Sequence, residues 1–390
     1  MIEPILYDYM HEMLRQTDYR HLRYMYDKIE WDDRLIGIVG PRGVGKSTMV
    51  LQRIKRLADP SKALYVSADN IYFSDHTLVG LADAFVKEGG SLLVIDEIHK
   101  YKQWSRELKN IYDVHPRLHV VFTGSSILDI RQGEADLSRR ALMYHMQGLS
   151  FREYLMIVHD VVTPAYSLED IVDHCVEMPV EHPLPYFRDY LARGYYPFGN
   201  ERGFVQRINQ VVSQTLYTDI AQYADIKPAT ARRLTQMLAV IARLAPYKPS
   251  YESLATEVGV SKNNVPDYLV LLEQAGMIGM LRDDTAGLRG LGKVEKVYID
   301  NPSLMSVLAA DKPDKGNLRE TFFYNQMRVA NDLSASRVSD FYIAPYTFEV
   351  GGKHKGKRQI SSVEHGIVVR DDIEYGGAGI VPLWHFGMNY

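Results

Sequence analysis

Residues 40 to 48 read Gly-Pro-Arg-Gly-Val-Gly-Lys-Ser-Thr and fit the pattern G-x-x-x-x-G-K-[ST]. An apolar run at 35–39 precedes the motif and a helix-like stretch follows it, which is the context in which such a loop surrounds phosphate groups. The glycines let backbone N–H groups turn inward, and the following helix adds the positive end of its dipole. The motif therefore restricts this part of the chain to an α/β fold with a phosphate-binding loop.

Each polar side chain at the end of the loop has a predicted role. Lys46 would reach the β- and γ-phosphates of a nucleotide, Ser47 would ligate Mg²⁺, and Thr48 would support the α-phosphate. ATP and Mg²⁺ are therefore the expected cofactors. The predicted nucleotide-binding set consists of Gly40, Pro41, Arg42, Gly43, Val44, Gly45, Lys46, Ser47, Thr48 and, from a second motif, Asp96.

The second motif is Leu-Leu-Val-Ile-Asp-Glu at 92–97, in which Asp96 comes fifty positions after Lys46. A buried strand that ends there would place Asp96 beside the phosphate loop, where its carboxylate can hold the Mg²⁺ shell. Glu97 then fits as the residue that orients or deprotonates the attacking water. Together the motifs predict hydrolysis, with Lys46 and Glu97 as catalytic residues and Ser47 and Asp96 as metal ligands.

Short apolar runs recur along the first 150 residues and alternate with helix-like stretches. The runs lie at 35–39, 63–66, 92–95 and 120–123, and residues 142–146 alternate in the manner of a fifth strand. One or two helices are expected before the first strand, over 4–30. Buried strands alternating with helices predict a mainly parallel sheet, so the fold class is an α/β P-loop NTPase domain.

Small hydroxyl residues follow the run at 120–123, in the sequence Gly-Ser-Ser at 124–126. P-loop ATPases of this kind keep a polar residue there that senses the γ-phosphate. Ser125 is the first candidate for that role and Ser126 the second. A plain turn after a strand explains the same serines equally well.

The segments 40–48, 96–104, 123–126 and 149–155 together resemble the prokaryotic AAA+-like ATPases that carry a C-terminal domain of unknown function. That family is related to archaeal ATPases and signalling NTPases. Many P-loop proteins share the first three motifs, and Leu-Ser-Phe-Arg-Glu-Tyr-Leu at 149–155 narrows the resemblance to this family. The resemblance covers most of the chain and implies ATP hydrolysis.

The resemblance also implies a basic residue a short loop after the sensor strand, a position matched by Leu-Ser-Arg-Arg at 137–140. The usual form has glycine before one arginine, whereas this chain has Ser138 and two arginines. Arg139 and Arg140 are both candidates for an arginine finger supplied by a neighbouring subunit of a homo-oligomer. A solvated or ion-paired arginine is an equal alternative. Arg193 is a weaker candidate for a phosphate contact.

His99 gives the segment 96–99 a superficial match to the Asp-Glu-x-His signature of helicases. A helicase would need a second α/β motor domain, but the alternation of strands and helices does not continue beyond residue 150. We therefore disfavour a helicase and expect His99 on the surface of a helix.

Length and composition indicate a soluble protein of several domains. The chain has 390 residues, of which 46% are apolar and 24% charged. The single cysteine, Cys175, suits a reducing compartment, and neither a signal-like start nor an apolar run of about 18 residues is present. We expect a cytoplasmic protein with no membrane association. The formal charge of -4 gives no electrostatic reason to presume nucleic-acid binding.

Four domains are expected, at 1–150, 151–226, 227–300 and 301–390. Amphipathic stretches without strands predict that the second is a helical lid. In the third, a helix, a tight turn at Gly259, a second helix and two strand-like segments predict a winged helix. Residues 221–300 carry ten Lys/Arg against nine Asp/Glu, so packing against the ATPase domain or a partner protein is favoured over reading of DNA.

Residues 301–390 combine a helix with several short strands, which resembles the restriction-endonuclease-like fold at the C-terminus of this family. Nucleases of that fold use an Asp and then Glu-x-Lys on the next strand, so that the acidic groups and the lysine meet at one metal and phosphate. The candidates are Glu320, Asp340, Glu349 and Lys353, with glycines 351 and 352 interrupting the Glu-x-Lys spacing. We predict this fold without DNA cleavage.

The predicted function is Mg²⁺-dependent ATP binding and hydrolysis, coupled to the winged-helix and nuclease-like region. Two alternatives stay open. One is a slow nucleotide-gated switch whose residues 221–390 engage a protein partner, and the other is an ATP-regulated DNA-binding protein or nuclease. The intact Glu97 favours hydrolysis over a slow switch.

Overall fold

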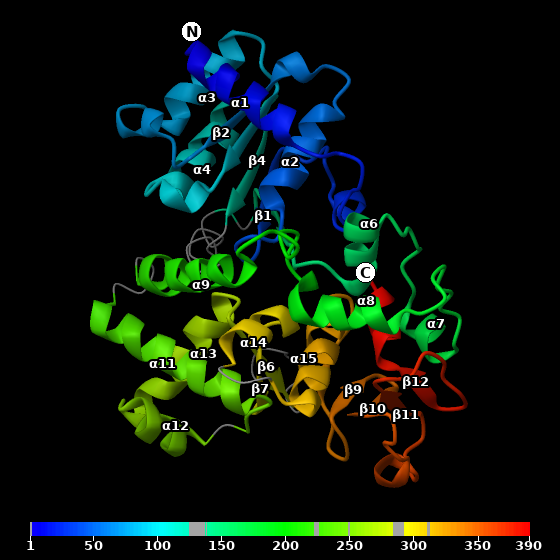
Figure 1. Cartoon of the computed structure of the whole chain (residues 1–390). Coiled ribbons are helices and arrows are strands. Elements are labelled where there is room, and N and C mark those ends of the chain that lie inside the picture. The colour runs from blue at the N-terminus through cyan, green and yellow to red at the C-terminus, as the bar shows by residue number, and fades with distance from the viewer. Residues whose placement is uncertain are drawn as a thin grey trace. The chain divides into compact units, whose positions relative to one another are not determined.

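A computed structural model describes residues 2–124, 137, 139–221, 226–248, 250–283, 292–309 and 313–390 of the chain. The chain divides into two compact units, Met1–Gln147 and Gly148–Tyr390, here named unit 1 and unit 2 (Figure 1). Among the helices in these ranges, none combines the length and the apolar character needed to cross a bilayer.

Unit 1 is built on a parallel sheet with the strand order β2-β3-β4-β1-β5. Its strands are β1 (Leu35–Val39), β2 (Ala63–Ser67), β3 (Leu92–Asp96), β4 (His119–Gly124) and β5 (Leu142–His145). The first four are buried along nearly their whole length, as parallel strands with both faces covered must be. The predicted strands and the parallel α/β sheet are confirmed.

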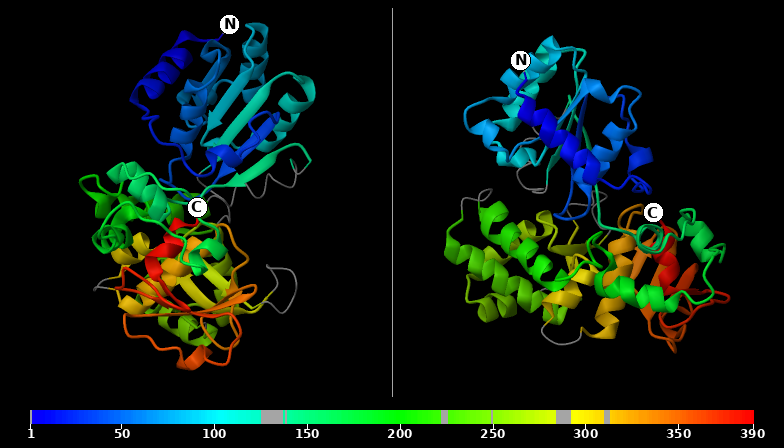
Figure 2. Two further views of the ribbon diagram at one scale, coloured as in Figure 1. Left: turned by 90° about the vertical axis from the view of Figure 1, so that its right-hand side faces the viewer. Right: turned by 45° about the horizontal axis from the view of Figure 1, so that its top comes forward.

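Within the described residues of unit 1, four α-helices accompany this sheet. They are α1 (Pro4–Gln16), α2 (Lys46–Lys55), α3 (Leu78–Lys87) and α4 (Trp104–Val114). The first packs against α2 and β2 and lies alongside the sheet (Figure 2), whereas α3 packs against α4. Gly37 in β1 allows the tight sheet packing, because a Cβ there would lie 2.4 Å from the sulfur of Met143.

Unit 2 begins with helices, namely α6 (Phe151–His159), α7 (Leu168–Val172), α8 (Leu184–Asp189) and α9 (Phe204–Gln214). π-Helical turns at Tyr190–Gly194 and Thr215–Asp219 extend α8 and α9. Three further helices follow, α11 (Pro228–Leu244), α12 (Tyr251–Val258) and α13 (Val265–Gln274), and then the antiparallel pair β6 (Ile278–Arg282) and β7 (Val294–Ile299).

The rest of unit 2 is a mixed sheet with two helices before it. The helices are α14 (Pro302–Leu308) and α15 (Lys315–Met327). The sheet has the order β12-β11-β10-β9-β8, in which β10, β11 and β12 pair in parallel and β9 is antiparallel to its neighbours. Its strands are β8 (Ser334–Ala335), β9 (Phe341–Ile343), β10 (Tyr346–Gly351), β11 (Gly366–Arg370) and β12 (Ile380–Pro382), and a 3-10 helix at Leu383–Met388 follows them.

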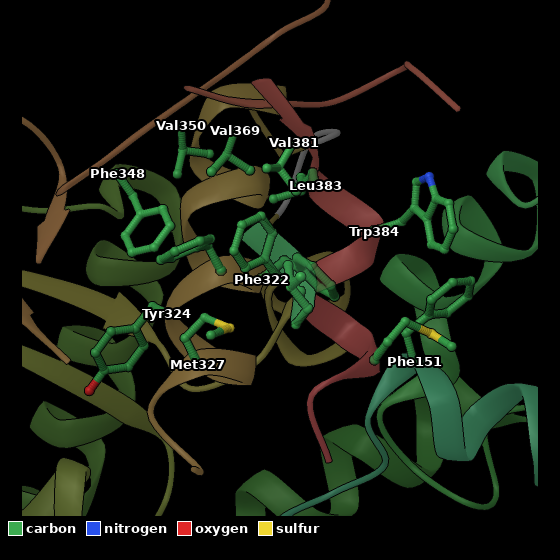
Figure 3. Packing of buried hydrophobic residues seen from close by; sticks show 14 of the residues in the cluster. Phe151, Phe322, Tyr324, Met327, Phe348, Val350, Val369, Val381, Leu383 and Trp384 are labelled. Carbon is green, nitrogen blue, oxygen red and sulfur yellow. The ribbon is translucent and has the colours of Figure 1, made fainter. Parts of the chain in front are cut away.

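One hydrophobic core joins the beginning and the end of unit 2. Phe151 and Tyr190 from the helical segment pack with Phe322 of α15, and Figure 3 shows Phe151 and Trp384 near this core with Val369 and Val381 of the sheet. Residues expected to form a separate helical lid therefore share a core with residues 281–388. The proposed boundaries at 226 and 300 stay a prediction.

The segment 149–155, which narrowed the family resemblance, is a folding element of this core. Ser150 caps α6: its Oγ accepts a hydrogen bond from the N–H of Glu153 at 3.1 Å, and the Glu153 carboxylate accepts one from the N–H of Ser150 at 3.3 Å. Ser150 Oγ also donates to the Tyr390 carbonyl at 2.5 Å. The motif thus fixes where α6 starts and ties it to the last residue of the chain.

Candidate functional site

The loop between β1 and α2 has the backbone conformation that its glycines predict. Gly43 and Gly45 have φ values of 78° and 98°, in the left-handed region that other residues rarely adopt. A Cβ at Gly40 would lie 2.1 Å from the Met146 carbonyl oxygen, so that position also needs glycine. The N-terminus of α2 follows at Lys46, and Ser47 and Thr48 occupy its first turn. This places helix N–H groups at the loop.

Lys46 is buried inside the loop, with 5% of its surface exposed. Its ammonium donates hydrogen bonds to the carbonyls of Gly40 at 2.8 Å and Pro41 at 2.7 Å. These partners are neutral dipoles. The positive charge of Lys46 is therefore held within the loop without being cancelled by these two groups, as a phosphate-binding lysine requires.

Arg23 connects the phosphate loop to the chain that follows β5, and the sequence did not predict this contact. Its buried guanidinium donates to the carbonyl of Val44 in the loop and, at 2.8 Å, to that of Gln147 after β5. No motif marks Arg23, because its partners are backbone carbonyls far away in the sequence. Its structural effect is to fix the loop conformation.

Asp96 ends β3 and is held by hydroxyl groups from both neighbouring strands. Tyr65 in β2 donates to one carboxylate oxygen at 2.6 Å, and Thr123 in β4 donates to the other. Burial first, and then the charge of Asp96, raises the pKa of the Tyr65 phenol, so it acts as a neutral donor. Asp96 itself is 5% exposed. Its carboxylate is thus oriented by groups that do not neutralise it.

Tyr65 and Thr123 were missed by the sequence analysis. The available signal was the polar residue Thr123 near the end of an apolar strand, next to the serines that were chosen instead. Thr123 is fully buried and also accepts a hydrogen bond from the N–H of Glu97 at 3.3 Å. One threonine therefore touches both acidic residues of the second motif. Ser125 and Ser126 lie outside the described residues.

Glu97 lies just beyond β3 with φ 52°, a left-handed conformation that turns its side chain away from the strand direction. Its carboxylate is 3.5 Å from the guanidinium of Arg42 in the loop and 3.5 Å from Nε2 of His99. The expectation that His99 lies on a helix surface is wrong: its side chain is 1% exposed, because the short 3-10 helix Ile98–Lys100 turns it inward beside Glu97.

The candidate arginine fingers differ in their surroundings. Arg140 forms an ion pair with Asp113 of α4 at 3.0 Å, whereas the neighbouring Arg139 is exposed. In unit 2, Arg193 pairs with Asp189 one turn earlier at 2.7 Å. Arg140 and Arg193 are therefore ion-paired, which was the alternative to a role as arginine finger or phosphate contact. Of the two loop arginines, Arg139 is the more accessible.

A second group of acidic residues lies in unit 2, where a nuclease-like site was expected. Glu320 and Asp340 come together, but the ammonium of Lys296 from β7 lies between them. Glu349 is paired with Lys355. The candidate Lys353 does not lie beside Glu349: as the two glycines predict, the strand ends at Gly351, and Lys353 is exposed. Lys355 reaches back to Glu349 instead.

Two family models match parts of the chain. Residues 32–155 match the family model described as an AAA domain. This part of the chain is thus similar to AAA domains. Residues 184–315 match a second model, described as a domain of unknown function. The two matches fall in unit 1 with the start of unit 2, and in the middle of unit 2.

The chain also resembles a relative over most of its length. An uncharacterized protein of Methanocaldococcus jannaschii is 26% identical over 434 residues, which cover 98% of this chain and 90% of the relative. Among solved structures, a Walker-type ATPase of Pyrococcus abyssi aligns over 76% of this chain and 94% of its own at 13% identity, with a TM-score of 0.42. AMPPCP-bound DnaA of Aquifex aeolicus aligns over 70% and 89% at 12% identity, with a TM-score of 0.25. Scores below 0.5 do not establish a shared overall fold.

Proposed function

We propose that unit 1 binds ATP with Mg²⁺ and hydrolyses it. The observation that carries the proposal is the contact between Arg42 and Glu97, 3.5 Å apart, because it joins the phosphate loop to the end of β3 in one site. Lys46, Asp96 and Glu97 then belong to a single constellation of the kind that phosphoryl transfer requires: a cation at the phosphates, a carboxylate for the metal shell and a carboxylate for water.

The residues at this site fit a magnesium ion. Ser47 and Asp96 supply the hard oxygen ligands that Mg²⁺ prefers, and Asp96 is oriented by hydroxyls that leave its charge intact. When bound, the ion would neutralise charge on the phosphate oxygens. The backbone from Gly40 to Thr48 would hold the phosphates, and Lys46 would exchange its loop carbonyls for phosphate oxygens.

In this proposal Glu97 orients or deprotonates the attacking water. Its N–H is fixed by Thr123, and its carboxylate is one quarter exposed, which leaves room for water beside it. Arg42 and His99 both lie 3.5 Å from the same oxygen of this carboxylate, so its position depends on the conformation of the phosphate loop. Nucleotide binding to the loop would then determine the position of the Glu97 carboxylate, which is the proposed general base.

The test is steady-state hydrolysis and ATP binding by Glu97→Gln, with the exposed Glu30→Gln as a matched control. We expect Glu97→Gln to bind ATP almost normally and to lose turnover by a factor of about 10²–10⁴, the usual contribution of a general base. Glu30→Gln should behave as wild type. Full turnover by Glu97→Gln would show that the catalytic assignment is wrong.

For unit 2 we propose a winged helix at 227–300 that engages a protein partner. The supporting features are α12 and α13 with a left-handed turn at Gly259, φ 70°, and the antiparallel pair β6–β7. The second helix is poor in cations, and its Glu273 pairs with Arg282 of β6 at 2.7 Å. That arginine is therefore engaged inside the module instead of being available for phosphates.

The DNA-binding alternative is tested by measuring affinity for single- and double-stranded DNA between 50 and 200 mM salt, at which a phosphate-binding surface loses affinity steeply, by a factor of about 10³ or more. We expect no specific or strongly salt-dependent binding. We also propose a cytoplasmic homo-oligomer, and a restriction-endonuclease-like fold at 301–390 that does not cleave DNA.

A further inference from the structure

Two carboxylates of unit 2 converge on one lysine. Glu320 comes from α15 and Asp340 lies just before β9, and the ammonium of Lys296 is 2.8 Å from the first and 3.0 Å from the second. All three side chains are between 16% and 18% exposed. Three separate elements thus bring their charged ends to one point.

Further donors fix both carboxylates. The Tyr298 phenol donates to Glu320 at 3.0 Å, on the same oxygen that Lys296 contacts. The backbone N–H of Val350 in β10 donates to the second oxygen of Asp340 at 3.0 Å. The carboxylates are therefore positioned as rigidly as ligands of a bound ion would be.

The cluster opens to a cavity. A space of about 490 Å³ is lined by Lys296 and Asp340, together with Lys248, Arg337 and Gln359. Small ions and water therefore have access to Asp340 and Lys296, so burial alone does not keep a metal ion away from Asp340.

Lys296 carries its charge in this setting. Burial alone would lower the pKa of its ammonium, but the charges and hydrogen bonds of Glu320 and Asp340 outweigh burial and raise it. Burial, and then repulsion from Asp340, raises the pKa of Glu320. One ammonium between two carboxylates leaves an excess of negative charge, which is the condition under which a cation is held tightly.

The third acidic residue of this region is engaged in the same way. Glu349 is 2% exposed and pairs with Lys355, while Ser339 donates a hydrogen bond to it. A Cβ built on Gly351 would lie 2.5 to 2.7 Å from side-chain carbons of Lys355, so this lysine runs over the space that a side chain at 351 would fill.

A nuclease-like fold implies a divalent cation on these carboxylates, and the residues present do not fit one. Oxygen ligands for Mg²⁺ must face an open position, whereas here each carboxylate faces an ammonium. Within the described ranges, no three His, Cys, Asp or Glu side chains are grouped so that they could hold a metal ion.

We propose that Lys296 is an internal cation that takes the place of a divalent metal between Glu320 and Asp340. In this proposal the centre holds no metal ion, because the ammonium of Lys296 occupies the position between the two carboxylates and offsets part of their charge. Because these residues all lie in unit 2, failure of ATP hydrolysis in unit 1 would leave the proposal standing.

Manganese binding in the absence of nucleotide, followed by electron paramagnetic resonance, tests the proposal on the full chain. The variants are Lys296→Met, the double variant Lys296→Met/Asp340→Asn, and Lys293→Met as a control at an exposed lysine of the same region. Wild type and Lys293→Met should bind Mn²⁺ weakly. Lys296→Met should bind one ion at least about tenfold more tightly, and the double variant should lose that gain.

Two outcomes would overturn the proposal. One is a folded Lys296→Met chain that binds Mn²⁺ no better than wild type. The other is tight Mn²⁺ binding by wild type that disappears in Asp340→Asn.

A second measurement covers the case in which Lys296→Met does not fold. The melting temperature of wild type is compared in Mn²⁺ and in EDTA, with Asp340→Asn measured alongside. We expect no difference between the two conditions for wild type. A metal-dependent rise in wild type that is absent from Asp340→Asn would refute the internal-cation assignment.

Discussion

Unit 1 and unit 2 each place acidic side chains at the end of strands, but the groups that hold those side chains are different. Asp96 in unit 1 accepts hydrogen bonds from the hydroxyls of Tyr65 and Thr123. Asp340 in unit 2 accepts from the ammonium of Lys296. A hydroxyl orients a carboxylate and leaves its charge for a cation, whereas an ammonium uses that charge. If both proposals hold, the identity of the donor distinguishes a site that takes up a metal ion from one that does not.

The lysines of the two regions differ in the complementary way. Lys46 donates to two neutral carbonyls, and Lys296 donates to two carboxylates. These two partners of Lys46 are uncharged, whereas both partners of Lys296 are carboxylates that offset its charge. If this contrast is correct, substitutions in unit 1 should damage function and substitutions in unit 2 should damage stability.

Lys46→Ala should show the largest effect. Removing the ammonium takes away the side-chain cation expected between the β- and γ-phosphates, and we expect ATP affinity to fall by about a hundredfold or more, or roughly 2.7 kcal/mol. Isothermal titration with ATP and Mg²⁺ measures it. Wild-type affinity in a folded Lys46→Ala chain would place the nucleotide elsewhere.

Asp96→Asn and Asp340→Asn test the difference between the two units directly, because each substitution neutralises one of the two carboxylates compared above. Asp96→Asn should reduce turnover by about two orders of magnitude, the scale on which loss of one electrostatic stabiliser is felt, and should change stability by no more than about 1 kcal/mol. Asp340→Asn should keep turnover and lose about 2 kcal/mol of stability, because Lys296 then lacks one of its two counter-charges.

Hydrolysis assays and urea unfolding of both variants provide the measurement. The contrast between the units would be refuted if Asp340→Asn abolished turnover while the protein stayed folded. It would be equally undermined if Asp96→Asn proved the more destabilising of the pair.

Unit 2 also contains a buried histidine, which should make the stability of the protein depend on pH. His385 of unit 2 is 6% exposed, and burial, followed by the neighbouring charge of His174, lowers the pKa of its imidazole from 6.5 to about 3. The unfolded chain therefore takes up a proton below pH 6.5 that the folded chain refuses until about pH 3. Stability contributed at neutral pH should be lost as the pH falls through that window, by roughly 2 to 3 kcal/mol at pH 4.5.

Urea unfolding at pH 7.5 and 4.5 checks this contribution. His385→Gln should flatten the pH dependence relative to wild type, whereas His11→Gln, at an exposed position, should leave it unchanged. An unchanged pH dependence in His385→Gln would mean that another group governs acid sensitivity.

Thr123→Val should have a smaller effect on turnover. The substitution keeps the shape of the side chain and removes the hydroxyl that orients Asp96 and the N–H of Glu97. We expect about a tenfold loss of turnover, equivalent to about 1.4 kcal/mol, with ATP affinity little changed. Ser339→Ala in unit 2 removes a hydroxyl that contacts Glu349 and should leave turnover intact. If Thr123→Val and Ser339→Ala lost turnover equally, the proposed functional difference between unit 1 and unit 2 would be refuted.

The sequence was most informative where function depends on residues close together in the chain. The phosphate loop, Asp96 and Glu97 follow from local patterns that fix strand, turn and helix in one stretch. Tyr65 and Thr123 could not be read in this way, because they reach Asp96 only through the order in which β2, β3 and β4 lie in the sheet.

Unit 2 shows the same limit. Gly351 and Gly352 predicted that the strand would bend or end before Lys353, but not that Lys355 would turn back over Gly351 and pair with Glu349. Lys296 was not considered, because it precedes Asp340 by 44 positions and belongs to a hairpin outside the nuclease-like module. Pairing of charges across elements is a tertiary property, which local spacing does not encode.

The smallest expected effect is the recovery of ATP hydrolysis through the arginines after β4. One of these arginines is ion-paired and the other is exposed. Arg140 is paired with Asp113 in its own subunit, and Arg139 is exposed, so Arg139 is the better candidate to reach the site of a neighbouring subunit.

The test mixes chains that carry Lys46→Ala with chains that carry Arg139→Ala. Some interfaces should then combine the intact nucleotide site of one chain with the intact arginine of the other. With random head-to-tail assembly these are roughly a quarter of the interfaces, which sets the ceiling on recovered hydrolysis. Hydrolysis by co-purified, differently tagged chains measures it, and Arg140→Ala alone should stay nearly as active as wild type. If co-assembled chains recover nothing, a finger acting between subunits is excluded. If Arg140→Ala is the variant that loses activity, the ion pair with Asp113 must break when the subunits associate.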